Sequence, residues 1–153
     1  MTTKPAQPVA THKPTVLVIE DNADQWFIID WAFRQQFDQV EPIWIADPAK
    51  AILFLEACLL DNEALPKLIL LDAYLPHFEQ SQKTLALLKA HPLYQDIPVL
   101  MLTSSRHAQD VQDCYESGCS SYLVKPTSPS QWQTLLAELR HYWWEIAELP
   151  SPH

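Results

Sequence analysis

Glycine is almost absent from this chain of 153 residues, which has one glycine, Gly118, and 13 prolines. Loops that wrap phosphate groups in nucleotide-binding proteins need several glycines at fixed spacing, because only glycine lets the backbone approach the phosphates closely. The sequence therefore excludes a P-loop and a dinucleotide-binding fingerprint.

Basic stretches and long apolar runs are also missing. Lys and Arg together number 10 against 19 Asp and Glu residues, and the formal net charge is −9. Without a basic stripe the chain cannot replace the counterions of a nucleic-acid backbone, so we expect no nucleic-acid partner. No apolar run reaches the roughly 20 residues that a membrane span needs, and the N-terminus lacks a secretory signal. We therefore predict a cytoplasmic protein with no membrane partner.

The three cysteines, Cys58, Cys114 and Cys119, include no C-x-x-C pair. An odd and scattered set of this kind is typical of a reducing compartment, so we predict neither a disulfide framework nor a zinc site. The six histidines never fall at metal-ligand spacing. We interpret them as solvated surface residues.

The chain does contain enough apolar sequence for one domain with a sizeable core, because 48% of its residues are hydrophobic. Residues 1–14 are rich in Thr, Pro, Ala and Gln and are predicted to form a flexible N-terminal tail. Residues 15–149 are predicted to form the domain, with an extended last helix. Residues 150–153 are predicted to form a C-terminal tail.

Five short apolar segments predict buried strands, each followed by a helical pattern. The strands are expected at residues 15–19, 41–46, 68–72, 99–103 and 121–124. The helices are expected at about 23–37, 48–60, 81–90, 108–117 and from 129 onward, with N-caps at Asn22, Asp47 and Ser128 and with Gly118 as the left-handed C′ residue of the fourth. This alternation predicts an α/β fold, a doubly wound five-stranded parallel sheet with five helices of the flavodoxin-like type.

Polar residues stand where four of these strands end. Glu20 and Asp21 follow the first strand, Asp72 ends the third, Thr103 ends the fourth and Lys125 follows the fifth. The carboxyl ends of parallel strands meet at one edge of the sheet, where ligands bind in open α/β folds. Carboxylates held together repel each other, and a hard cation such as Mg²⁺ relieves that repulsion. We therefore predict a Mg²⁺ site where Asp72 takes up a phosphoryl group beside Lys125 and Thr103.

With these residues in order, the chain resembles the receiver domains of two-component response regulators. The resemblance covers residues 16 to about 149 and rests on Glu20-Asp21, Asp72 with Leu75-Pro76, Thr103-Ser104 and Lys125-Pro126. The EDN opening at 20–22, the Lys-Pro pair and an aromatic last helix ending in Leu149-Pro150 are similar to the single-domain regulators of bacterial and cyanobacterial phytochromes. No sequence remains for an output domain, so we expect a single-domain regulator.

The resemblance implies a role for each matching residue. Asp72 would accept the phosphoryl group from a histidine kinase of the phytochrome type, and Glu20, Asp21, Asp72 and the backbone carbonyl of Tyr74 would hold Mg²⁺. Lys125 would contact the phosphoryl oxygens, while Thr103 and Tyr122 would move together as the switch. The Lys125–Pro126 peptide bond would be cis. Such a protein is no enzyme beyond catalysing its own phosphorylation and dephosphorylation.

The sequence departs from the family after Pro76, where residues 77–80 read His-Phe-Glu-Gln in place of x-Met-Asp-Gly. The missing glycine puts a positive φ in this loop in doubt. Tyr74 and Ser105 occupy positions that tune phosphate lifetime in the family, and a bulky tyrosine would shield the phosphoaspartate from water. We therefore expect slow self-dephosphorylation.

Other interpretations remain open. A receiver-like scaffold that binds its partner without phosphorylation is compatible with the altered loop and with the many aromatic residues. Asp72 considered alone would also fit a turn cap. A hydrolase of the haloacid dehalogenase type is disfavoured, because such enzymes usually carry a second acid two residues after the nucleophile, where this chain has Tyr74.

Aromatic side chains are more numerous in the first and last helices than one small core needs. They are Trp26, Trp31, Tyr142, Trp143 and Trp144. Because large rings are favoured at interfaces, we predict a homodimer through the last helix and a kinase contact through the first. The alternative is that most of these rings fill the core.

Overall fold

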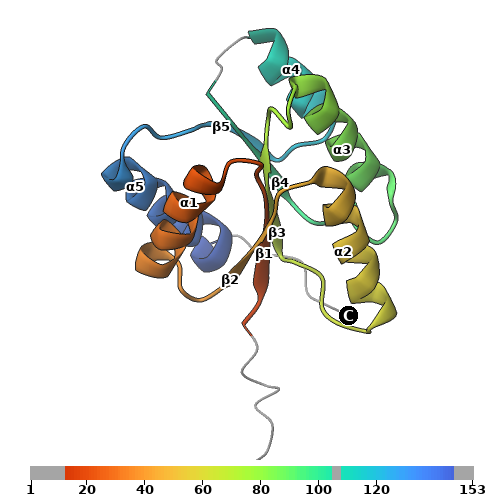
Figure 1. Cartoon of the computed structure of the whole chain (residues 1–153), viewed down its shortest axis with the longest axis horizontal. Coiled ribbons are helices and arrows are strands. Elements are labelled where there is room, and N and C mark those ends of the chain that lie inside the picture. The colour runs from red at the N-terminus through yellow and green to blue at the C-terminus, as the bar shows by residue number, and fades with distance from the viewer. Residues whose placement is uncertain (1–12, 105–107, 147–153) are drawn as a thin grey trace, which may run out of the picture.

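The computed structural model of the protein describes residues 13–104 and 108–146. Its centre is a five-stranded sheet with helices on both faces, which confirms the predicted α/β fold (Figure 1). The strands lie in the order β2-β1-β3-β4-β5, and every neighbouring pair is parallel. Their bounds are β1 (Thr15–Ile19), β2 (Glu41–Ile45), β3 (Leu68–Asp72), β4 (Val99–Thr103) and β5 (Ser121–Val124).

Two helices cover one face of the sheet and three cover the other (Figure 1). The first pair is α1 (Ala23–Gln36) and α5 (Pro129–Leu139), and a π-helical segment, η2 (Arg140–Ile146), continues from α5. The other face carries α2 (Pro48–Leu60), α3 (Phe78–Ala90) and α4 (Ala108–Glu116). No helix among these described elements is long and apolar enough to cross a membrane.

The two layers of the core follow from the alternation of side chains along each strand. Leu17, Ile69 and Met101 point into the layer under α2, α3 and α4, whereas Leu70 and Leu100 point into the layer under α1 and α5. All five residues of β3 and of β4 are buried, because these strands are central and covered on both faces. Burial on both faces therefore explains why these two strands are continuous aliphatic runs in the sequence.

The predicted helix starts are confirmed at three capping residues. The side chains of Asn22, Asp47 and Ser128 accept hydrogen bonds from the backbone N–H groups of Gln25, Ala49 and Gln131 at 3.0, 2.7 and 3.3 Å. Each cap satisfies a backbone donor that the first helical turn leaves without a partner.

One helix start was predicted wrongly. The third helix begins at Phe78 and not at about Ser81, because the His77 carbonyl already accepts the Ser81 N–H, at 3.4 Å, and the Ser81 hydroxyl donates a hydrogen bond of 2.7 Å to the backbone oxygen of Asp72. The last helix continues beyond Leu139, and it becomes π-helical at Arg140. There the Arg140 guanidinium donates a hydrogen bond of 2.7 Å to the backbone oxygen of Gln36 at the end of α1.

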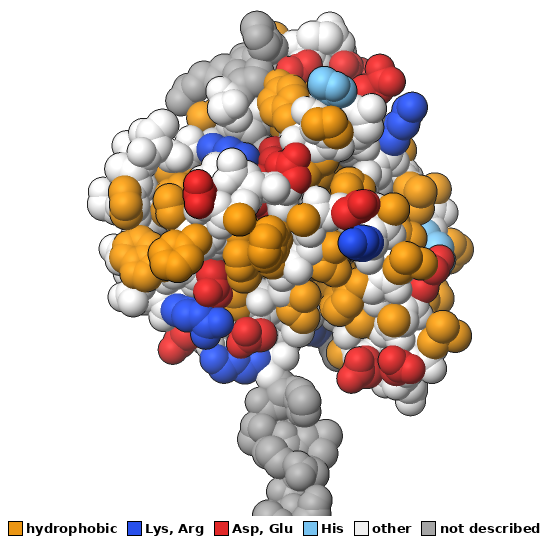
Figure 2. Space-filling view, viewed as in Figure 1, with side chains coloured by type: hydrophobic (Ala, Val, Ile, Leu, Met, Phe, Trp, Pro, Cys, Tyr) orange, Lys and Arg blue, Asp and Glu red, His pale blue; other side chains and the backbone are white. Residues whose placement is uncertain are grey.

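The aromatic residues of the first and last helices divide between the core and the surface. Trp26, Trp31 and Trp143 are half-buried and pack against the core under α1 and α5, whereas Tyr142 and Trp144 remain 54% and 37% exposed. Phe27, on α1, is 75% exposed. In the face drawn in Figure 2, hydrophobic side chains gather over the helices on either side of the sheet. The core therefore explains three of the five predicted interface rings.

Candidate functional site

The candidate site lies where β1 and β3 end side by side in the middle of the sheet. The order of the strands reverses at this point, which in doubly wound folds opens a crevice beyond the carboxyl ends of the strands. Glu20 and Asp21 follow β1, and Asp72 is the last residue of β3. One carboxylate oxygen from each of these residues lies within 4.8 Å of the other two.

Lys125 reaches this carboxylate cluster from the end of β5. Its Nζ atom lies 3.2 Å from Glu20 Oε1 and 3.4 Å from Asp72 Oδ1, and its side chain is only 16% exposed. The backbone N–H of Lys125 donates to the Thr103 carbonyl at 2.7 Å, which extends the pairing of β4 with β5 up to the site. One lysine thus faces three carboxylates, so negative charge remains for a cation to offset.

Burial is the main reason why the pKa of Glu20 is raised from 4.5 to about 7. The hydrogen bond with Asp72 and the Asp72 charge raise this pKa further, and the Lys125 ammonium opposes the rise. The residue is also held in place, because the Trp44 indole N–H donates to the Glu20 carbonyl at 2.6 Å and the Asn22 N–H donates to Oε2 at 3.2 Å. A bound divalent cation would compete with this proton.

The loop after β3 fixes the Asp72 carboxylate from its own backbone. The Tyr74 N–H donates to Asp72 Oδ1 at 3.1 Å, and the Tyr74 hydroxyl donates to Asp110 Oδ2 on α4 at 3.0 Å. The half-buried Tyr74 ring lies 6.1 Å from the Phe78 ring, centroid to centroid. Among the described residues, positive φ occurs only at Asn62 and Gly118, so the loop without glycine adopts ordinary backbone angles.

The remaining predicted residues are Thr103, Tyr122 and Ser105, of which the first two lie on strands β4 and β5. Thr103 is fully buried at the end of β4, and its carbonyl accepts the Lys125 N–H. Tyr122 is half-buried on β5, packs against the core under α2 to α4, and donates its backbone N–H to the Tyr115 hydroxyl at 3.2 Å. Ser105 lies outside the described residues. The switching roles of Thr103 and Tyr122 stay predictions.

Two expectations about covalent geometry were wrong. Within residues 13–104 and 108–146 the cis peptide bond is Leu75–Pro76, and Lys125–Pro126 is not cis. Proline lowers the cost of the cis form at either bond, so the sequence alone does not choose between them. The structure also contains a disulfide between Cys114 and Cys119, while Cys58 is free and buried. The cysteines therefore include one disulfide-bonded pair, which the absence of a C-x-x-C pattern did not indicate.

Sequence reasoning missed three partners of the site, namely Trp44, Ser81 and Asp110. Ser81 could have been noticed as a polar residue near a helix start, but its bond to the Asp72 carbonyl depends on the path of the loop. Asp110 is 36 positions from Tyr74, and Trp44 is 24 positions from Glu20. No local pattern signals contacts at such separations.

Comparison with known proteins decides the family. The family described as the response regulator receiver domain matches residues 16–137. The chain belongs to this family. A probable methanogenesis regulatory protein of Methanothrix harundinacea, FilR2, is 28% identical over 90% of this chain and 88% of its own length. The response regulator Rcp1 of Synechocystis is 28% identical over 89% of this chain and 92% of its own length.

Solved structures extend the likeness to phytochrome regulators. The phosphorylated cyanobacterial phytochrome response regulator RcpA superposes with a TM-score of 0.79 at 28% identity, covering 92% of this chain and 99% of RcpA. The Mn²⁺-bound form of Rcp1 superposes with a TM-score of 0.77 at 28% identity, covering 90% of this chain and 99% of that one. The predicted resemblance to these regulators is therefore confirmed.

The donor set of the site is suited to a hard divalent cation. The cluster offers carboxylate oxygens only, from Glu20, Asp21 and Asp72, and two of these residues are buried. Ions such as Mg²⁺ and Mn²⁺ prefer oxygen ligands of this kind. The residues present therefore fit divalent metal binding, as the Mn²⁺-bound relative also suggests.

Proposed function

We propose that the protein is a phosphorylation-dependent switch of a two-component system in which Asp72 accepts a phosphoryl group from a sensor histidine kinase. The observation that carries this proposal is the environment of Asp72. Its buried carboxylate lies within 4.8 Å of the Glu20 and Asp21 oxygens and 3.4 Å from Lys125 Nζ. Membership of the receiver family supports a phosphohistidine as the donor.

In the proposed reaction, one Asp72 carboxylate oxygen attacks the phosphorus of the phosphohistidine. The bond between phosphorus and the histidine nitrogen breaks, and the nitrogen leaves with the electron pair, so that an aspartyl phosphate forms. The Lys125 ammonium lies where negative charge on the transferred group has to be offset. Glu20, Asp21, Asp72 and the Tyr74 carbonyl would hold Mg²⁺, which would supply further positive charge. We propose no catalysis beyond this phosphorylation and the dephosphorylation of Asp72.

Thr103 and Tyr122 are the proposed switch residues. The Thr103 side chain, buried at the end of β4 next to the start of the Lys125 loop, moves to the phosphoryl oxygens. Tyr122 lies on β5, the neighbouring outer strand, and its ring moves into the space that the Thr103 side chain leaves. The outer strand and α4 then present a different surface to a partner.

The proposed kinase is of the phytochrome type, because Rcp1 and RcpA resemble this chain over nearly their whole length. The proposed place of action is the cytoplasm, where histidine kinases present their phosphorylated domains. We further propose a homodimer through η2 and α5, supported by the exposed rings of Tyr142 and Trp144.

Intact mass after incubation with Mg²⁺ and acetyl phosphate tests the proposal. The wild type should gain one phosphoryl group, while Asp72→Asn and the wild type in EDTA should gain none. Asp24→Asn, which changes an exposed acid in the first turn of α1, should behave like the wild type. A phosphoryl group on Asp72→Asn would show that another residue is the acceptor.

The second candidate is a scaffold that binds its partner without phosphorylation. The loop at 77–80 favours it, because α3 begins at Phe78 without the glycine that the family usually has there. A wild type that gains no phosphoryl group, yet unfolds at a higher temperature when Mg²⁺ is added, would favour the scaffold over the switch.

A further inference from the structure

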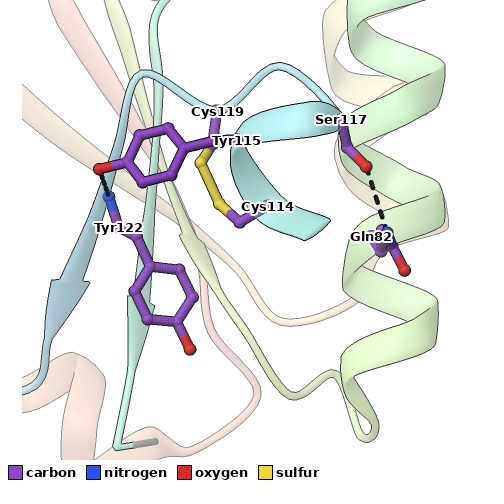
Figure 3. Close-up of a disulfide and its surroundings, with 6 residues drawn as sticks. All are labelled: Gln82, Cys114, Tyr115, Ser117, Cys119 and Tyr122. Atoms are coloured by element: carbon purple, nitrogen blue, oxygen red, sulfur yellow. Dashed lines mark hydrogen bonds between the residues drawn. A yellow bond between two sulfur atoms is a disulfide. The ribbon is translucent and has the colours of Figure 1, made fainter. Parts of the chain in front are cut away.

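The disulfide joins the end of α4 to the start of β5. Cys114 lies in the last turn of α4, and Cys119 lies two residues before β5 (Figure 3). Cys114 is fully buried, while Cys119 is 6% exposed. Among the described residues of α4, Cys114 is the only one whose side chain is fully buried. The attachment of α4 to the core therefore depends mainly on this side chain.

The end of α4 is built to bring the two cysteines together. The Cys119 N–H donates to the Cys114 carbonyl, and the Gly118 N–H donates to the Tyr115 carbonyl, both at 3.1 Å. These two bonds define a Schellman motif, in which the third-last residue of the helix, Cys114, and the third residue after the helix, Cys119, make contact. Here that contact is the disulfide, with 5.7 Å between the two Cα atoms.

The only glycine of the chain makes this motif possible. Gly118 has φ +103°, a value that other residues rarely adopt, and a Cβ atom there would lie 2.8 Å from Lys89 Cγ on α3. The same short loop is bonded to α3 through Ser117, whose hydroxyl accepts a hydrogen bond from Gln82 at 3.3 Å (Figure 3). The single glycine of the chain therefore lies at the turn that closes the disulfide loop.

Both ends of α4 are connected to the proposed phosphorylation machinery. At its first turn, Asp110 accepts the hydroxyl of Tyr74, two residues after Asp72. At its last turn, the Tyr115 hydroxyl accepts the backbone N–H of Tyr122, and the Tyr122 ring points away from the disulfide (Figure 3). The disulfide at Cys114 would therefore restrict any movement of α4 and Tyr122 that accompanies phosphorylation.

We propose that Cys114 and Cys119 form a redox-modifiable site for a dithiol, and that their disulfide restrains α4 and β5 so that phosphorylation of Asp72 is slower. This inference rests on the proposed function. It also agrees with the general behaviour of disulfides in cytosolic proteins, which are usually transient and serve redox sensing or catalysis.

The redox step is a thiol–disulfide exchange. A thiolate of the dithiol attacks the sulfur of Cys119, which is the more exposed residue of the pair, and Cys114 leaves as a thiolate that takes up a proton. The second thiol of the reagent then attacks the mixed disulfide and releases Cys119. Two electrons pass to the protein, both cysteines become thiols, and the dithiol becomes a disulfide. Reoxidation by an oxidised dithiol reverses each step.

Phosphorylation kinetics in the two redox states provide the first test. The Cys58→Ala protein keeps the pair and removes the third thiol, so alkylation followed by intact mass reports the pair alone. This protein is oxidised with an oxidised dithiol or reduced with dithiothreitol, and each form receives Mg²⁺ and acetyl phosphate. The reduced form should be phosphorylated at least about fivefold faster, the lower end of typical allosteric coupling.

Equal rates, or a faster oxidised form, would overturn the inference while leaving the proposed function intact. Failure of both forms to gain a phosphoryl group would instead reject the proposed function, and the coupling with it. A pair that stays as two thiols in the presence of the oxidised dithiol would also overturn the inference. Because the comparison uses the same Cys58→Ala protein in two redox states, it does not require a variant of Cys114 or Cys119 to fold.

The midpoint potential of the pair provides the reciprocal test. If phosphorylation is also fivefold more favourable at equilibrium in the reduced form, then the pair becomes easier to reduce by the same factor, because coupling between two equilibria, unlike coupling between rates, is reciprocal. For a two-electron couple this factor raises the potential by about 20 mV. The potential is measured with Mg²⁺ alone and with Mg²⁺ and beryllofluoride as the phosphoryl mimic. An unchanged potential would overturn an equilibrium coupling between the disulfide and the phosphorylated state.

Discussion

Among single residues, Glu20 is the one whose protonation the fold changes most clearly. Its pKa is about 7 in the folded protein against 4.5 ordinarily, so between these values the folded state holds a proton that the unfolded chain has released. The contribution of Glu20 to stability is therefore complete below pH 4.5 and is lost as the pH rises through about 7. In EDTA, urea unfolding should show the free energy falling over this range, and Glu20→Gln should flatten the fall.

Glu56→Gln, at an exposed site on α2, is the matched control and should keep the wild-type pH profile. With Mg²⁺ present the wild-type slope should reverse, because metal binding requires the ionised carboxylate. Parallel profiles for the wild type and Glu20→Gln in EDTA would show that burial does not hold a proton on this residue.

The charged residues of the site could be predicted because each stands directly at the end of a strand. Glu20, Asp21, Asp72 and Lys125 needed only the strand positions and the rule that parallel strands end at one edge. The raised pKa of Glu20 could not be predicted, since it depends on how deeply the residue is buried. The types and order of these residues predict the kind of site, whereas the burial of each side chain depends on how the helices and strands pack together.

At the scale of secondary-structure elements, the loop after β3 and the helix α4 are joined by the Tyr74–Asp110 hydrogen bond. This bond holds the half-buried Tyr74 ring against α4, and we expect the ring to shield an aspartyl phosphate on Asp72 from water. Tyr74→Phe keeps the ring and loses a bond worth about 1 kcal/mol, so dephosphorylation should accelerate by no more than about fivefold. Tyr74→Asn removes the ring and should accelerate it further. Loss of the phosphoryl group is followed by intact mass.

The comparison of the two variants separates the ring from its hydrogen bond. If Tyr74→Asn decays at the wild-type rate, the ring does not shield the phosphate. If Tyr74→Phe decays as fast as Tyr74→Asn, the position of the ring depends on Asp110 and therefore on α4. Gln109→Ala, next to Asp110 on an exposed face of α4, is the control and should leave the lifetime unchanged.

Elements were predictable where a local signal determines them. The strands follow from continuous aliphatic runs, and the starts of α1, α2 and α5 follow from side chains that cap them. The start of α3 was missed because its N-cap residue, His77, makes no capping side-chain hydrogen bond, and the disulfide was missed because only the Schellman end of α4 brings Cys114 to Cys119. Both features depend on how the chain turns between elements, which side-chain periodicity does not report.

For the molecule as a whole, the surface of η2 supports the predicted homodimer. Tyr142 and Trp144 are 54% and 37% exposed. Because the net charge is −9, two copies of the chain repel each other, and apolar contacts such as these rings are needed to offset that repulsion in a dimer. Aromatic residues at the centre of an interface commonly contribute more than about 1 kcal/mol each to binding. We therefore expect a dimeric mass by light scattering, and Tyr142→Ser combined with Trp144→Ser should weaken the dimer at least about tenfold.

Phe27→Ser is the matched control, because Phe27 is 75% exposed on α1 and lies outside the predicted dimer surface. It should keep the dimeric mass, and it should slow phosphorylation by the kinase without slowing phosphorylation by acetyl phosphate if α1 meets the kinase. A monomeric mass for the wild type, both before and after phosphorylation, would contradict the dimer. Dimers in all three proteins would place the interface elsewhere than on η2. We therefore predict two different surfaces, with η2 facing a second copy of the chain and α1 facing the kinase.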